Sequence, residues 1–180
     1  MDAEELLRRY AAGERDFTGA TLERIRMKDE NLRESILTRA NLYGVRLNGV
    51  NLRDARLDGA NLGRAELEGA DLRNANLAGA CLNEANLIAA DLKAANLRGA
   101  DLREASLNNT DLRNADLSHA LLGQAGLDSA DLRNADLIEA QLYDATLNNA
   151  DLRGADLTGA NLTGTNLTNA NLENAILDGC

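Results

Sequence analysis

Apart from its carboxylates, this chain has few side chains that could act as acids or bases, as nucleophiles or as metal ligands. His119 is the only histidine, which excludes a histidine-based triad and a multi-histidine metal site. The two cysteines, Cys81 and Cys180, lack metal-ligand spacing and cannot form a disulfide framework. The dipeptides Asn48-Gly49 and Asp58-Gly59 read as turns and do not lie in a phosphate-binding loop. We therefore expect no enzymatic activity, no catalytic residues, no metal and no cofactor.

The carboxylates are abundant. The 180 residues carry 29 Asp and Glu against 19 Lys and Arg, a formal charge of -10. Direct nucleic-acid binding is not expected, because it needs net positive charge to displace counterions; an acidic balance favours solubility or a basic partner. No apolar stretch approaches transmembrane length and the start, MDAEELLRRY, does not resemble a signal peptide. We expect a cytoplasmic protein that does not bind membranes.

The elements that position these carboxylates follow from an internal repeat of five residues. From Phe17 to Leu177, every fifth residue forms an unbroken series of 33 central positions, of which 31 are leucine. Two residues before the central position, 25 of 32 residues are alanine. The unit is A-[DN]-L-x-x, as in Ala70-Asp71-Leu72-Arg73-Asn74.

Neither a helix nor a continuous strand accommodates this period. In a helix, five residues advance by about 140° net, so successive leucines would spiral around the axis. In a strand, side chains alternate with period two, and five is odd. Within one pentad, alanine and leucine share a face, so the chain must turn once per pentad to bring the next pair inside.

The residues two after each central position suit such a turn. Of these 33 corner positions, 11 are Gly, 7 are Asn and 3 are Asp, all of which tolerate positive φ. Corners of about 90° close a square in four pentads, which gives a 20-residue coil. Stacked coils would pair their backbones like parallel strands and bury leucine and alanine along the axis. An all-β solenoid is therefore expected.

The unbroken A-[DN]-L-x-x series resembles the pentapeptide-repeat proteins of cyanobacterial type, and the resemblance covers about nine-tenths of the chain. It implies a right-handed quadrilateral β-helix over residues 14–180. The 33 pentads would make about eight coils and a rod ~40 Å long at ~4.8 Å per coil.

A short capping helix is expected over residues 1–13. Asp2 and Glu5 form a capping-box pattern, and Gly13 suits the position after the last helical residue. One face of this helix is apolar and would cover the first coil; it comprises Ala3, Leu6, Leu7, Tyr10 and Ala11. The first coil is the least regular, with Ile25, Met27, Glu30 and Ser35 at inward positions. We expect Glu30 to be displaced or paired.

At the other end, Leu177 is followed by Asp178-Gly179-Cys180. An uncovered coil would fray or pair with a second molecule, so we expect a tail-to-tail homodimer. The residues at its interface would be Ile176, Leu177 and Cys180.

Residues 20 apart fall into columns on the outer surface. One face carries a column of aspartates, Asp71, Asp91, Asp111, Asp131 and Asp151, and beside it a column of cations, Arg33, Arg53, Arg73, Lys93, Arg113, Arg133 and Arg153. Each carboxylate has a cation two residues along, and further cations lie diagonally, so a self-neutralising ladder is expected. A functional basic stripe is the alternative.

A second face is less balanced and is the candidate partner-binding surface. It collects Asp116, Asp136, Glu139, Asp156 and Asp178, with His119 among them and few cations. The alternative is a plain solvated acidic face. A third face carries Tyr43, Cys81, Leu121 and Tyr143 outward, too scattered to predict an apolar interface.

The sequence is consistent with two functions. The first is a rod-like scaffold that binds an unidentified protein; the segment Leu7–Phe17 is similar to the starts of such repeat proteins, many without an assigned role. The alternative comes from the branch of the family whose members mimic B-DNA, bind DNA gyrase and protect it from quinolone-type inhibitors. A DNA rod of ~40 Å would carry roughly 24 charges, whereas this chain has a net -10. Those relatives also commonly place Phe at the central position, where this chain has Leu.

Overall fold

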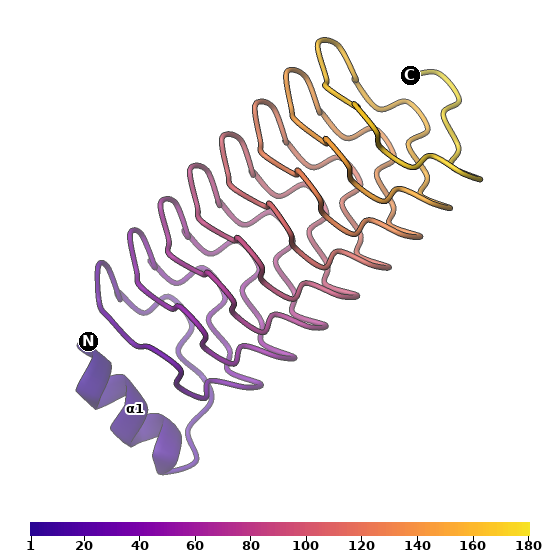
Figure 1. The fold of residues 1–180 in the computed structure, drawn as a ribbon. Helices are drawn as coiled ribbons and strands as arrows, with labels where there is room; N and C mark the ends of the chain where they lie inside the picture. Colours follow the sequence, from indigo (N-terminus) through magenta and orange to yellow (C-terminus); the bar gives the residue numbers. More distant parts are fainter.

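The fold rests on backbone pairing between residues 20 apart. The computed structural model describes residues 1–180, and its coils stack side by side from one end of the molecule to the other (Figure 1). Parallel bridges join each residue before a central position to its equivalent 20 residues on, from Asp16↔Ile36 to Asp156↔Ile176. These are isolated single-residue bridges, so the chain contains no extended strand. The 20-residue register holds four pentads, as the period predicted.

Each pentad follows the same hydrogen-bonding scheme, which Leu72 illustrates. Its N–H donates to Asp91 O in the next coil at 2.7 Å, and its carbonyl accepts from Ala75 N at 3.0 Å across the corner. Asp91 N donates back to Ala70 O at 2.9 Å. The backbone polar groups on both sides of a coil are thereby satisfied, as a buried repeat requires.

The predicted turn at every pentad is confirmed. All 33 corner residues have positive φ: 11 are glycines, and the other 22 have φ between 54° and 60°. The non-glycine corners hold Asn, Asp, Glu, Gln, Arg, Ala, Ser and His, and none is β-branched. This exclusion follows from sterics, because a branched Cβ suffers most in the left-handed region.

The core is one cluster of 54 buried hydrophobic residues that runs the length of the stack. Central leucines from Leu22 to Leu157 are at most 1% exposed, and the alanines two residues before them fill the remaining space. Phe17 is the one aromatic residue in the cluster. With each buried leucine contributing roughly 1.5–3 kcal/mol, the cluster stabilises the fold without further aromatic residues.

Helix α1 (Ala3–Ala11) lies across the first coil (Figure 1). Asp2 is its N-cap, with Oδ1 accepting from Glu5 N at 2.8 Å. Leu6 is fully buried against the core, and Tyr10 Oη donates to Arg33 O at 3.0 Å. Ala11, predicted on the apolar face, is exposed; it belongs to the final turn, next to the C-cap Ala12.

The first coil departs from the repeat where its sequence does. Glu30 is exposed, as expected for a carboxylate at an inward position, and Asp29 forms a bend where other pentads have a regular turn. Ser35 stays inward and fully buried, and its hydroxyl has no hydrogen-bond partner. A carboxylate must leave the core because its desolvation is too costly, whereas a hydroxyl can remain at a smaller cost.

Candidate functional site

Three of the predicted partner-binding carboxylates stack on one another. Parallel bridges pair Asp116 with Asp136 and Asp136 with Asp156, so their side chains leave successive coils from the same position. No cation forms an ion pair with any of the three. We call these three residues the acidic column. Like charges directly opposite one another repel, so the column costs the fold free energy.

Local hydrogen bonds orient the carboxylates of the acidic column. Asp116 Oδ1 accepts from Ser118 N and Oγ at 2.9 and 2.5 Å, and Asp156 Oδ1 accepts from Thr158 N and Oγ1 at 2.9 and 2.6 Å. Asp136 accepts only from Ile138 N, at 2.9 Å. The bonds from the Thr158 hydroxyl and backbone hold the pKa of Asp156 below its ordinary value.

The other two predicted residues lie beside the column. Glu139 occupies a corner at φ 55°, where its Oε2 is 3.1 Å from His119 Nδ1 of the preceding coil. Asp178 is exposed, and its carbonyl accepts from Gly159 N at 2.7 Å. The structure thus places Glu139 and Asp178 on the same side of the stack, outside the bridged column.

Arg98 also contributes to the surroundings of the acidic column, and the sequence analysis did not identify it. It lies one coil before Ser118, and its Nη1 donates to Ser118 Oγ at 2.9 Å, while Ser118 Oγ in turn donates to Asp116. The guanidinium therefore bounds the acidic column on its N-terminal side. The 20-residue arithmetic would have located it, since 98 and 118 belong to one column.

The neighbouring face shows the contrast that makes the acidic column distinctive. Arg113 Nε donates to Asp111 Oδ1 at 2.9 Å, and the same pairing within a pentad recurs at Asp71/Arg73, Asp131/Arg133 and Asp151/Arg153. Diagonal contacts of 3.4–3.6 Å link these arginines to the aspartate of the next coil. This paired ladder confirms the predicted self-neutralisation, except at Lys93, which has no ion pair.

The end of the stack formed by residues 161–180 is open. Ile176 and Leu177 are 45% and 42% exposed, the two exposed large hydrophobic residues of the protein. The central leucines Leu162, Leu167 and Leu172 are only partly buried. Cys180 is exposed, and its thiol donates to Leu157 O at 2.9 Å.

The two tyrosines of the third face pack at separate places along the stack. Tyr143 packs over Gly123, and Tyr43 packs against Gly63.

Neither a metal-binding cluster nor a membrane-spanning helix is present in the structure. The structure contains no group of three or more His, Cys, Asp and Glu side chains that could hold a metal ion. α1 has neither the length nor the apolar character to cross a lipid bilayer.

Comparison with known proteins places the chain among repeat proteins. The sequence profile of the family described as pentapeptide repeats matches in eight copies, over residues 16–54, 51–87, 85–124, 115–154 and 147–180. No curated protein matches the sequence.

Several solved structures are similar. HetL, a pentapeptide repeat protein involved in heterocyst differentiation regulation from the cyanobacterium Nostoc sp. strain PCC 7120, is 36% identical over 98% of this chain and 95% of its own, with a TM-score of 0.44. The pentapeptide repeat protein alr5209, also from Nostoc, is 47% identical over 42% of this chain and 62% of its own, with a TM-score of 0.41. QnrB1, a plasmid-mediated fluoroquinolone resistance protein, is 23% identical over 92% of this chain and 84% of its own, with a TM-score of 0.43. With the profile matched from residue 16 to residue 180, the chain belongs to the pentapeptide repeat family.

Proposed function

We propose that the protein is a non-enzymatic rod that binds a partner protein through the acidic column and its neighbours Glu139 and Asp178. The observation that carries this proposal is the contrast between two adjacent faces. On the paired ladder, most aspartates bond an arginine of their own pentad. In the acidic column, three stacked aspartates have no cationic partner. A basic surface of another protein would supply the missing positive charge.

The test compares two triple variants of equal charge change. Asp116→Asn/Asp136→Asn/Asp156→Asn neutralises the acidic column, and Asp71→Asn/Asp111→Asn/Asp151→Asn neutralises part of the paired ladder. Binding to partners recovered with the wild-type protein should fall in the first variant only and weaken as salt rises, because exposed charges are screened beyond about 10 Å at 0.1 M salt. Equal binding by both variants would contradict the proposal.

A second candidate, DNA mimicry toward DNA gyrase, is favoured by the regular spacing of the acidic column along the stack. The test is a supercoiling assay with purified gyrase and micromolar protein. Salt-sensitive inhibition that disappears in the Asp116→Asn/Asp136→Asn/Asp156→Asn variant would support mimicry. No effect of the wild-type protein would dispose of it and leave the scaffold proposal intact.

The open end suits self-association, and we propose a tail-to-tail homodimer through Ile176, Leu177 and Cys180. Ile176 and Leu177 are exposed, and Leu162, Leu167 and Leu172 of the same coil are only partly buried, so this end presents apolar surface. Pairing two such ends would remove that surface from water. Sedimentation at high micromolar concentration should give a dimer, and Leu177→Asp should give a monomer; a monomeric wild-type protein would refute this arrangement.

We also infer a right-handed quadrilateral β-helix of about eight coils as the finer description of the stack. The 20-residue bridge register and the four corners per register support it. We propose the division into a cap of residues 1–13 and a β-helix of residues 14–180, which is supported by α1 ending at Ala11 and the first bridge beginning at Asp16.

A further inference from the structure

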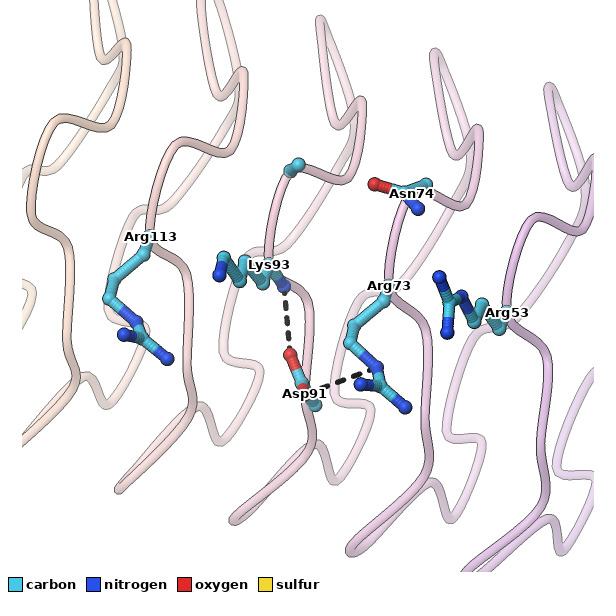
Figure 2. Close-up of a pocket in the computed structure, with 7 residues that line it drawn as sticks. Arg53, Arg73, Asn74, Asp91, Lys93 and Arg113 are labelled. Carbon is cyan, nitrogen blue, oxygen red and sulfur yellow. Dashed lines mark hydrogen bonds and ion pairs between the residues drawn. The ribbon is translucent and has the colours of Figure 1, made fainter.

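A hollow of about 320 Å³ lies over the middle of the paired ladder, away from the acidic column. Four cations line it: Arg53, Arg73, Lys93 and Arg113 (Figure 2). Asn74, Ala94 and a single carboxylate, Asp91, complete the lining. We call this hollow the basic notch. Its lining carries four positive charges and one negative charge.

Lys93 is the reason that the ladder is unbalanced here. In the arginine pentads, the guanidinium bonds the aspartate two residues earlier, as Arg113 bonds Asp111. In the lysine pentad, only the backbone N of Lys93 donates to Asp91, at 3.1 Å. The Asp91 carboxylate instead lies 3.4 Å from Arg73 Nε (Figure 2). The ammonium of Lys93 therefore has no carboxylate partner.

The flanking arginines also retain unused donors. Arg73 and Arg113 bond their aspartates through Nε and one terminal nitrogen, Nη2. In each, Nη1 remains without a hydrogen bond. Arg53 has Asn51 instead of an aspartate two residues earlier, and its buried Nε makes no hydrogen bond although Asp54 Oδ2 is 3.5 Å away. The notch thus offers several charged N–H donors from successive coils.

Ala94 leaves the notch open. Of the other corners in its column, only Gly154 is smaller; the rest carry longer polar side chains and are Glu34, Asp54, Asn74, Asn114, Asn134 and Asn174. Ala94 keeps the same left-handed backbone, with φ 57°, but has only a methyl group. Alanine is unfavourable in this region, and the side chains found at the neighbouring corners would extend into the space beside Lys93.

We propose that the basic notch binds a phosphate-type oxyanion, either a free anion or a phosphate monoester on a partner. A phosphate monoester carries a charge of about -1.5 to -2 at pH 7 and three acceptor oxygens. Arginine forks and a lysine ammonium are the donors that such groups prefer. A ligand that offered a single carboxylate would accept hydrogen bonds from fewer of the unused N–H donors than a phosphate would. Coil spacing of ~4.8 Å brings Arg73, Lys93 and Arg113 within reach of one bound group.

The test uses inorganic phosphate as the probe and amide chemical shifts of the full-length protein as the readout, against sodium chloride at equal ionic strength. Shifts should centre on Asn74, Lys93 and Ala94. Ala94→Glu places a carboxylate in the notch at a corner type that already holds Glu34, so the fold should tolerate it. Affinity should fall by about tenfold in Ala94→Glu and in Lys93→Ala, through loss of charge-assisted hydrogen bonds.

Asn134→Glu is the matched control, because it adds the same charge to the same column two coils away; its affinity should change by less than about twofold. A phosphoserine peptide forms a second arm. Tighter binding of the peptide than of phosphate identifies a phosphorylated partner, and equal binding identifies the free anion. The proposal is overturned if chloride reproduces the shifts, if they spread evenly over the column, or if both glutamate variants weaken binding equally.

Discussion

Arg113 bonds the same oxygen of Asp111 twice, through Nε at 2.9 Å and through its backbone N at 3.1 Å. The same arrangement holds Asp71, Asp101 and Asp151 against the arginine two residues on. The guanidinium hydrogen bonds keep the pKa of each of these four carboxyls below its ordinary value. A folded-state pKa lower than the unfolded one means that folding favours the charged form.

Acid should therefore weaken the fold through these Asp–Arg pairs. The contribution is complete above the unfolded aspartate pKa of about 3.9 and is lost as pH falls through the lower folded pKa values. Asp111→Asn should lower stability at pH 7 by up to about 1 kcal/mol and reduce the loss between pH 7 and about pH 3. Urea midpoints at the two pH values measure both effects. Asp178→Asn, at an exposed carboxylate without an ion pair, is the control, and equal pH slopes for the wild-type protein and Asp111→Asn would contradict the prediction.

Ser35→Ala should stabilise the protein. The Ser35 hydroxyl is fully buried without a hydrogen-bond partner, and alanine is the usual residue at this pentad position. Removing an unsatisfied buried hydroxyl should raise the free energy of unfolding by about 1 kcal/mol.

Thr110→Ala is the comparison, because Thr110 Oγ1 donates to Leu87 O at 2.9 Å in the same kind of position. That variant should lose about 1–2 kcal/mol, from the hydrogen bond and a buried methyl group. Urea unfolding followed by circular dichroism compares the two variants, and a destabilised Ser35→Ala would show that the hydroxyl has a partner in solution.

Corner substitutions should change stability according to backbone conformation alone. Gly79 has φ 62°, and a Cβ built there meets nothing within 4 Å, so Gly79→Ala should cost about 1 kcal/mol through left-handed strain. Ala89 has φ 55°, so Ala89→Gly should gain about 0.5 kcal/mol, the strain relieved less the entropy cost of glycine. Opposite shifts in the urea midpoint are expected, and shifts of the same sign would refute this account.

Spacing predicted which residues share a column, because a strict period of five fixes the position of each pentad in a 20-residue coil. The stacking of Asp116, Asp136 and Asp156 follows from that arithmetic. Spacing could not predict which partner a side chain selects when two are within reach. Asp91 lies near Arg73 of the preceding coil rather than bonding the ammonium of Lys93, a choice set by rotamers and by the rigid geometry of the guanidinium.

Local departures from the repeat were predictable only in part. Glu30 was expected to be displaced or paired, and it is exposed, because burying a carboxylate is costly. The exposure of Ala11 depends on how α1 meets the first coil, which helical periodicity does not specify. The basic notch likewise requires the side-chain directions of Lys93 and its neighbours, although the alanine at position 94 was visible in the column.

Gly123 should resist substitution because of an aromatic ring. A Cβ built at Gly123 would overlap the ring of Tyr143, which covers that glycine from the next coil. Gly123→Ala should displace the ring and cost about 1–3 kcal/mol, as overpacking does. At Gly63 the closest contacts to a built Cβ are 3.0 Å to Asn83 Oδ1 and 3.2 Å to Tyr43 Cδ2, so Gly63→Ala should be milder.

Tyrosine fluorescence can follow this displacement, because the chain has three tyrosines and no tryptophan. In a Tyr10→Phe/Tyr43→Phe background, Tyr143 is the only emitter. Gly123→Ala should then increase quenching by acrylamide as the ring leaves the surface of the coil. Gly79→Ala in the same background is the control, since no side chain covers that corner. Unchanged quenching with a stable fold would mean that the backbone shifts to accommodate the methyl group while Tyr143 keeps its place.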